Sequence, residues 1–169
     1  MKYLLKIKAD MSHVKKMTPN GGVDSENMPY FFKLRCEHCD ELSKRQCVYM
    51  SEAVNYGRDV VNHVLKCKGC KETGAVTLIS GYGRDLTVSG AYAPLMLFEC
   101  TNGLVPEGYE FNGGWTLTTD SNKVIMDVNL VRNFFCGNFD EYGNQPTIEN
   151  TRGKITFYQE YFILFLNKS

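Results

Sequence analysis

The sequence lacks a long apolar run and a signal-peptide core. Its most apolar stretch, residues 161–166, is short, whereas about twenty apolar residues are needed to cross a bilayer. Near the start of the chain, Lys6 and Lys8 interrupt the apolar residues, so no signal-peptide core forms. We therefore expect a cytoplasmic protein with no membrane partner, and access to the nucleus stays open.

The chain also lacks an excess of charge of either sign. Nineteen basic side chains stand against nineteen acidic ones, so the formal net charge is zero. A neutral chain exerts no long-range attraction on DNA, RNA or an anionic membrane. Residues 33–72, which include the cysteine pairs described below, carry eight basic and six acidic residues. We therefore expect a monomer that binds a protein partner and no nucleic acid.

Sequence motifs of catalysis are lacking as well. The chain holds no glycine-rich phosphate loop leading into a helix, no Gly-x-Ser-x-Gly and no His-Glu-x-x-His. The candidate acids lie in or beside turn-forming sequences, which is typical of solvated loop residues: Asp120, Asp127, Asp140 and Glu141. We therefore predict no catalytic residues, no organic cofactor and no enzymatic activity.

What the chain does have is cysteine in an informative arrangement. Four of its seven cysteines form two Cys-x-x-Cys pairs, Cys36 with Cys39 and Cys67 with Cys70, with 27 residues between the pairs. An odd number of cysteines in such pairs favours a metal in a reducing compartment over disulfide bonds. Two residues between cysteines allow a tight turn to direct both thiolates to one ion, and two such turns complete a tetrahedral shell. We predict one structural Zn²⁺ per chain, bound by these four cysteines.

Other chemistries of the four thiolates stay open from the sequence alone. Two separate redox pairs are typical of βαβ sequences, and no such pattern is present here. A four-thiolate iron site has a similar spacing, and the sequence does not separate iron from zinc. A catalytic zinc keeps one position for water, which four cysteines would fill.

The remaining histidines and cysteines near the pairs are weaker candidates. His38 and His63 could replace a ligand, but the cysteines already complete the shell. The other three thiols are predicted to be small buried residues: Cys47, Cys100 and Cys136.

Segments of alternating or β-branched residues, separated by turn formers, dominate the rest of the chain. Strands are predicted over residues 30–35, 60–66, 75–79, 95–98, 123–130 and 154–166. Residues 51–64 could instead form a helix, although Gly57 interrupts it, and the segment up to residue 28 is polar beyond an initial strand. Trp115 is predicted to lie in the core or at its rim. We expect one domain over residues 1–169, all-β and sandwich-like, in which two zinc knuckles within residues 33–72 join hairpins.

Six segments of the chain together resemble a known family in sequence and in order: residues 32–39 (FKLRCEHC), 57–58 (GR), 65–70 (LKCKGC), 98–106 (FECTNGLVP), 126–130 (MDVNL) and 139–142 (FDEY). Together they resemble the eukaryotic CXXC-motif-containing zinc-binding protein family over nearly the whole chain. The resemblance implies an all-β intracellular protein with zinc ligands at the four paired cysteines. It implies no reaction, because the function of the family is obscure. Residues 18–27 and the final residues 167–169 depart from the family pattern.

From these features we expect a non-enzymatic zinc protein that acts in protein–protein interaction, as an adaptor or chaperone-like factor. A metal-transfer protein is one alternative, and it would need exposed, exchangeable thiolates; Cys47 is the further thiol closest in sequence to the first pair. A nucleic-acid-binding zinc-ribbon module is another alternative, and it would need a basic face with exposed aromatic residues. Loss of zinc should loosen the knuckle end while a separate apolar core persists.

Overall fold

The structure is a computed structural model that describes residues 1–137 and 142–159. Within them the chain forms β-strands and no helix, so no helix able to cross a membrane is found in this part of the chain. The strands are β1 (Lys2–Ser12), β2 (Val14–Pro19), β3 (Tyr30–Cys36), β4 (Gln46–Val48), β5 (Val54–Tyr56), β6 (Asp59–Val61), β7 (His63–Lys66), β8 (Thr73–Ile79), β9 (Ala93–Cys100), β10 (Leu104–Glu110), β11 (Trp115–Thr119), β12 (Val124–Val128), β13 (Phe134–Phe135) and β14 (Thr147–Tyr158). The predicted all-β fold is confirmed.

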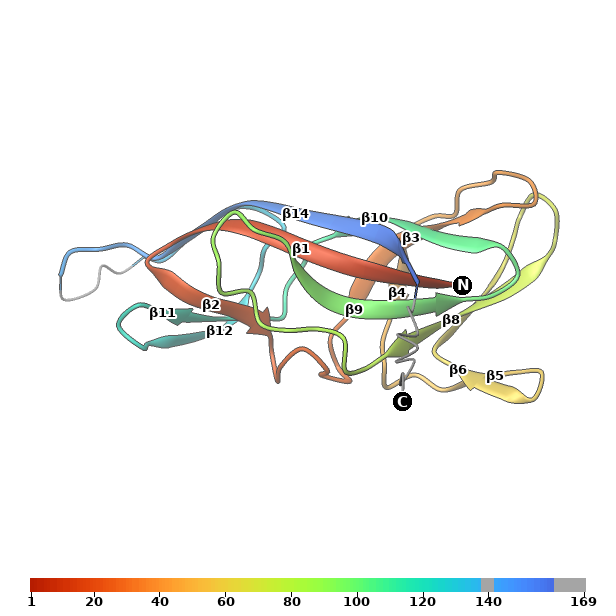
Figure 1. Ribbon diagram of the computed structural model, residues 1–169, viewed down its shortest axis with the longest axis horizontal. Coiled ribbons are helices and arrows are strands. Elements are labelled where there is room, and N and C mark those ends of the chain that lie inside the picture. Colours follow the sequence, from red (N-terminus) through yellow and green to blue (C-terminus); the bar gives the residue numbers. More distant parts are fainter. Residues whose placement is uncertain (138–141, 160–169) are drawn as a thin grey trace, which may run out of the picture.

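The strands form antiparallel sheets that curl into a half-barrel (Figure 1). The largest sheet has six strands in the order β13-β14-β1-β9-β8-β7, with the long strand β1 between β14 and β9. Two three-stranded sheets, β10-β3-β4 and β12-β11-β2, and the hairpin β5-β6 complete the fold. The turn between β9 and β10 leads the chain from the six-stranded sheet into the sheet β10-β3-β4.

Alternation of apolar and polar residues explains why these segments become strands with one buried face. Tyr30, Phe32 and Leu34 alternate along β3, as predicted, and each is at most 1% exposed. Phe32 stacks on Phe98 of β9 with ring centroids 4.9 Å apart. Full burial of one such side chain stabilises the fold by about 1.5–3 kcal/mol. The main core therefore lies between the six-stranded sheet and the sheet that carries β3.

A second part of the core lies at the end of the molecule with β2, β11 and β12. Trp115 begins β11, is fully buried, and packs against Phe111 with ring centroids 5.4 Å apart. Met17 on β2 and Leu117 on β11 are fully buried beside it. The prediction that Trp115 belongs to the core is confirmed.

The structure differs from the sequence expectations in three places. Residues 51–64 contain the hairpin β5–β6 instead of a helix, and Gly57 in its turn has a φ of +61°, which suits glycine and ends any helix. The segment before residue 28 contains β2 although it is polar, because β2 pairs with β11 and Met17 exchanges backbone hydrogen bonds with Leu86. The strand predicted over residues 154–166 begins earlier, at Thr147, and residues 160–166 lie outside the described part of the chain.

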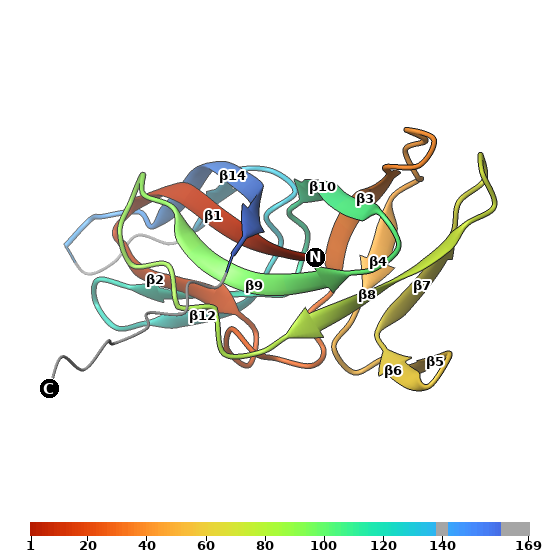
Figure 2. The same cartoon turned by 45° about the vertical axis from the view of Figure 1, so that its right-hand side comes forward.

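Three turns meet at one end of the molecule, and they position the cysteines. The turn after β3, the turn between β7 and β8, and the turn between β9 and β10 all lie there (Figure 2). The first turn belongs to the β10-β3-β4 sheet and the second to the six-stranded sheet. A metal that joins these two turns would therefore brace one sheet against the other.

Candidate metal centre

The first knuckle closes the tip of the hairpin that begins with β3. Its backbone folds back on itself: the N–H of Asp40 donates to the carbonyl of Cys36 at 2.7 Å, and the N–H of Cys36 donates to the carbonyl of Glu41 at 2.9 Å. Asp40 adopts a φ of +64°, a left-handed conformation that turns the chain sharply after Cys39. This turn directs the side chains of both cysteines to one side.

The second knuckle repeats this backbone between β7 and β8. The N–H of Lys71 donates to the carbonyl of Cys67 at 3.0 Å, and the N–H of Cys67 donates to the carbonyl of Glu72 at 2.8 Å. Lys71 has a φ of +66°, almost the same as its counterpart Asp40. The chain therefore contains two copies of one knuckle, each at the tip of a hairpin, as the sequence predicts.

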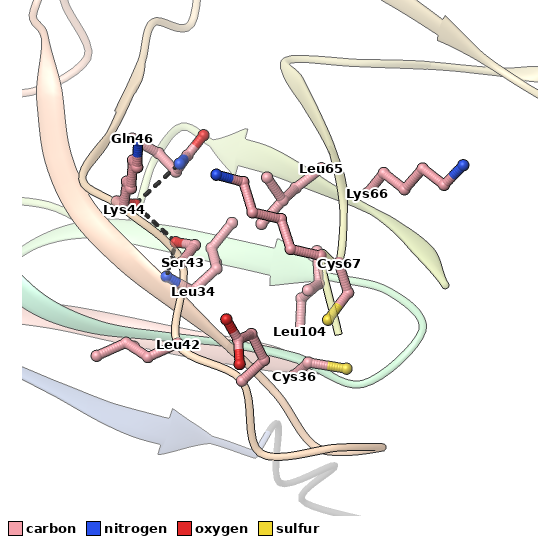
Figure 3. A pocket seen from close by; sticks show the side chains of 12 residues that line it. Leu34, Cys36, Leu42, Ser43, Lys44, Gln46, Leu65, Lys66, Cys67 and Leu104 are labelled. Atoms are coloured by element: carbon pink, nitrogen blue, oxygen red, sulfur yellow. Dashed lines mark hydrogen bonds between the residues drawn. The ribbon is translucent and has the colours of Figure 1, made fainter. Parts of the chain in front are cut away.

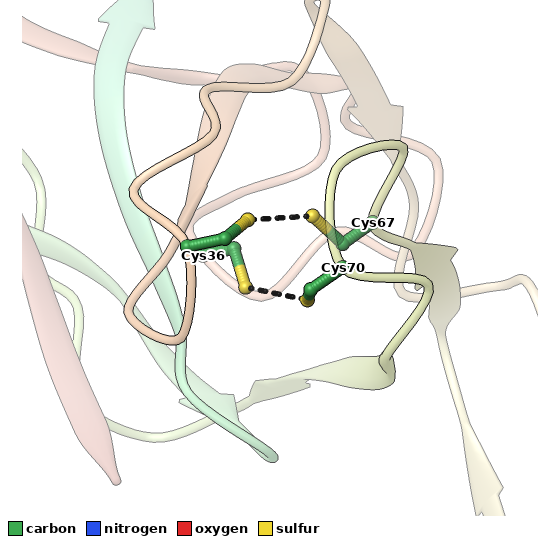
Figure 4. Close-up of side chains that lie close together, drawn as sticks. Cys36, Cys67 and Cys70 are labelled. Carbon is green, nitrogen blue, oxygen red and sulfur yellow. Dashed lines mark hydrogen bonds between the residues drawn. The ribbon is translucent and has the colours of Figure 1, made fainter.

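The two knuckles face each other and bring the four predicted sulfur atoms together (Figure 4). The Sγ atoms of Cys36 and Cys70 are 3.7 Å apart, those of Cys39 and Cys67 are 3.4 Å apart, and all four lie within 4.8 Å of one another. A tetrahedral zinc site with Zn–S bonds of about 2.3 Å requires S···S separations of about 3.8 Å. Each of these two close contacts joins a cysteine of one knuckle to a cysteine of the other. The four thiols therefore fit one Zn²⁺.

Backbone amides around the second knuckle favour the thiolate form of its first cysteine. The N–H of Cys70 lowers the pKa of Cys67 to about 7, and the N–H of Gly69 acts in the same direction. The thiolate is the form that binds a metal. Lysine side chains on the same turn add positive charge near a zinc centre that would carry two negative charges: Lys66, Lys68 and Lys71.

The turn between β9 and β10 ties the two knuckles together. Asn102 donates from Nδ2 to the carbonyl of Thr73 at 2.8 Å and to the Glu72 carboxylate at 3.2 Å, just after the second knuckle. On its other side, the Asn102 carbonyl and Oδ1 lie 3.0 and 3.1 Å from Nε2 of His38 in the first knuckle. The carbonyl of Gly103 accepts the N–H of Glu37 at 2.8 Å. Sequence reasoning missed this role of Asn102, although Asn-Gly is a typical hairpin turn.

Gly69 is a second residue that the sequence did not single out. A Cβ atom at this position would lie 2.9 Å from Sγ of Cys39 and 3.7 Å from Sγ of Cys67. Its counterpart in the first knuckle is His38, whose side chain points to Asn102 instead. The second knuckle therefore needs glycine at this position to let the sulfur atoms of both knuckles approach.

Neither nearby histidine joins the cluster. His38 binds Asn102, as described, and Nε2 of His63 lies 2.9 Å from Oε1 of Gln46, which links β7 to β4. Burial lowers the pKa of His63 and keeps its ring neutral in this position. Both histidines therefore have structural partners.

The three remaining cysteines lie apart from the cluster. Cys100 is 2% exposed, and burial raises the pKa of its thiol to about 12. Cys47 and Cys136 are half-buried, so the prediction that they are buried is wrong for these two. Short strands at sheet edges, β4 for Cys47, bury their side chains less completely than the central β9.

A cavity of about 230 Å³ adjoins the cluster (Figure 3). Cys36 and Cys67 line it together with the apolar side chains of Leu34, Leu65 and Leu104. These two cysteines are 2% and 5% exposed, whereas Cys70 is half-buried and Cys39 is exposed. One side of the cluster is therefore shielded by leucines, and the other faces solvent.

An all-β chain with two hairpin knuckles and a four-thiolate cluster defines a zinc-binding protein in which the metal cross-links the fold. Comparison with known families agrees: the family described as "CXXC motif containing zinc binding protein, eukaryotic" matches residues 4–156. The chain belongs to this family, and the resemblance noted from the sequence is confirmed. Its cofactor is one Zn²⁺, for which the four cysteines lie within ligand distance.

Individual relatives match this chain at low sequence identity. The "UPF0587 protein" of Dictyostelium discoideum is 24% identical over 128 residues, which is 75% of this chain and 78% of the relative. The crystal structure of C1orf123 has a TM-score of 0.80 and 22% identity, covering 92% of this chain and 99% of that one. A hypothetical protein from Plasmodium falciparum has a TM-score of 0.77 and 15% identity with the same coverage, 92% and 99%. At these identities the two structures establish the fold alone.

Proposed function

We propose that this chain is a non-enzymatic protein in which zinc has a structural role and that binds a protein partner in the cytoplasm, as an adaptor or chaperone-like factor. The structural role rests on one observation, the closed set of four thiolates contributed by two backbone-locked knuckles. Four protein ligands fill a tetrahedral shell, so water and substrate have no position on the metal. None of the seven cysteines, all of which lie in the described residues, forms a disulfide bond, which supports a reducing compartment.

The acidic residues near turns support a non-catalytic assignment where the structure describes them. Asp127 accepts a hydrogen bond from Nδ2 of Asn20 at 2.6 Å, and Asp120 lies 3.8 Å from Nδ1 of His13. Both contacts hold turns together at a distance from the sulfur cluster. Asp140 and Glu141 lie outside the described residues.

The proposal is tested by comparing wild type with Cys67→Ser in native cytosolic extract. We expect wild type to contain one zinc per chain and to retain one protein partner in stoichiometric amount, while the variant loses the metal. If the wild-type protein retains zinc but captures no protein partner at native salt, the adaptor role is contradicted. Stoichiometric iron in place of zinc would contradict the metal assignment.

Metal transfer is the second candidate, and one observation favours it. Cys39 is exposed and Cys70 is half-buried, so an incoming thiolate could reach the metal from that side. A structural site should release zinc to a chelator over hours, because two ligands are shielded by leucines. Release within seconds to a thiol chelator, with the fold intact by circular dichroism, would instead favour transfer.

A further inference from the structure

The outer face of the six-stranded sheet carries a concentration of positive charge that the neutral composition conceals. On β1, the alternate residues Tyr3, Leu5 and Ile7 are buried, so Lys6 and Lys8 lie on the opposite, outer face. In the antiparallel ladder with β14, Lys6 lies directly opposite Lys154. The neighbouring outward pair is Lys8 opposite Arg152. We call these four residues the basic quartet.

This arrangement costs the free protein stability. Residues directly opposite in an antiparallel ladder share a face with Cβ atoms about 4.5–5.5 Å apart, and like charges at such positions are destabilising. Among the ion pairs of residues 1–137 and 142–159, none places a carboxylate within 4.0 Å of any member of the quartet. Two successive like-charged pairs with no counter-ion among the described residues are therefore destabilising unless a partner supplies negative charge.

An aromatic ring holds two of the cations in place. Nζ of Lys8 lies 5.0 Å from the centroid of the Tyr92 ring, and Nζ of Lys154 lies 5.8 Å from the same centroid. Tyr92 is 38% exposed. Cation–π attraction orients both ammonium groups without neutralising them. The quartet therefore keeps its charge and loses part of its side-chain freedom before any partner binds.

The sequence of charges along the ladder selects the kind of partner. Beyond a bulge after Lys8, the next pair on the ladder is Asp10 opposite Glu149, so two carboxylates follow two pairs of cations. Asp10 is held by Nδ2 of Asn150 at 2.8 Å. A uniform polyanion such as RNA would extend from the quartet onto these carboxylates and be repelled. A protein segment can match both regions with acidic residues followed by basic ones.

The spacing also fits an extended peptide. Successive pairs of the quartet are two residues apart along β1, about 6.6–6.8 Å at the rise of a strand. Alternate side chains of an extended peptide repeat at the same interval on one face. We propose that the outer face of β1 and β14 binds an extended acidic segment of a protein partner, with carboxylates at alternate positions on the quartet. This inference depends on the proposed function, since it names the chemistry of the partner.

The test uses zinc-loaded protein and three probes: an octapeptide alternating Glu and Thr, the same peptide with Gln for Glu, and oligothymidylate of equal charge. Wild type should bind the Glu peptide and gain thermal stability from it, and it should bind the other two probes more weakly. Lys154→Glu should unfold within about 2 °C of wild type without peptide, because the attractive pair that it forms with Lys6 offsets the lost cation–π contact with Tyr92. The same variant should bind the Glu peptide about tenfold more weakly.

Arg58→Glu is the matched control, because it makes the same change of charge at an exposed turn remote from the quartet. It should bind the Glu peptide like wild type. Equal binding of the Glu peptide by Lys154→Glu, or tighter binding of oligothymidylate than of peptide, overturns the inference. Retention of the native partner by Lys154→Glu would overturn the inference while leaving the proposed adaptor function intact, whereas a wild type with no partner would defeat the function itself.

Discussion

The two knuckles have one backbone and opposite surroundings. Both use the same pair of backbone hydrogen bonds and the same left-handed residue after the second cysteine. Their flanking charges differ: Glu37, Asp40 and Glu41 make the first knuckle acidic, whereas lysines at positions 66, 68 and 71 make the second basic. The shared backbone turns both cysteines of a knuckle to one side, while the side chains decide how closely the two knuckles approach and how each half of the site is supported.

The largest effect should come from removing a ligand. Replacing Cys67 by Ser leaves three thiolates and removes the sulfur whose pKa the amides lower, so zinc content should fall well below one per chain. Hydrogen exchange should rise first in residues 34–48 and 64–79, which the metal braces. Residues 115–128, where Trp115 is fully buried in the part of the core at the other end of the molecule (Figure 1), should stay protected longer. Uniform loss of protection across both regions would contradict this division.

A smaller effect on zinc affinity should distinguish substitution of Gly69 from substitution of its counterpart His38. Gly69→Ala places a methyl group 2.9 Å from Sγ of Cys39 and should weaken zinc binding by about 10–100-fold, as loss of a close supporting contact does. His38→Ala removes a side chain that points away from the sulfur atoms, so zinc affinity should stay within about threefold of wild type. Competition with a chromophoric chelator measures both values. Equal affinities for the two variants would show that the cluster tolerates the methyl group.

The sequence predicts the metal centre better than it predicts the support around it. The paired cysteines give their ligand chemistry directly, because a Cys-x-x-Cys turn is a local structure. Asn102 lies 63 positions beyond Cys39 in the chain, and its bonds to Thr73 and His38 exist only after three turns from different parts of the chain have packed together. No local sequence pattern predicts such a contact.

The same distinction applies to the fold. Alternation predicted β3 and its buried face correctly, because that pattern depends on one strand and one core. The polar strand β2 escaped prediction, since its backbone partners on β11 lie about a hundred residues away. The basic quartet was invisible for a related reason: the zero net charge averages over the chain, whereas the pairing of β1 with β14 concentrates charge on one face.

Asn102→Ala should have the third-largest effect, and it tests whether Asn102 couples the two knuckles. It removes the two bonds from Nδ2 to the residues after the second knuckle and the Oδ1 contact with His38. These groups are exposed, but alanine must also adopt the left-handed φ of +52° at this position, so we expect a loss of about 1–2 kcal/mol in the free energy of unfolding. In a double-mutant cycle with His38→Ala, the two losses should be less than additive. Full additivity would mean that Asn102 supports each knuckle independently.

The smallest effect concerns the left-handed residue of each knuckle, and it compares the two directly. Lys71→Gly relieves a conformation that costs an L-residue about 1–2 kcal/mol, and the greater chain entropy of unfolded glycine offsets about 0.5–1 kcal/mol of that gain. The lost Lys71 ammonium, which donates to the carbonyl of Lys68 at 2.9 Å, is exposed and offsets little of this gain, so the zinc-loaded variant should unfold about 1–2 °C higher than wild type. Asp40→Gly should bring no such gain, because aspartate tolerates this conformation and Asp40 also pairs with Nη1 of Arg35 at 3.3 Å. Thermal unfolding of both variants with zinc bound measures the difference, and a gain for Asp40→Gly equal to that for Lys71→Gly would mean that the ion pair contributes nothing.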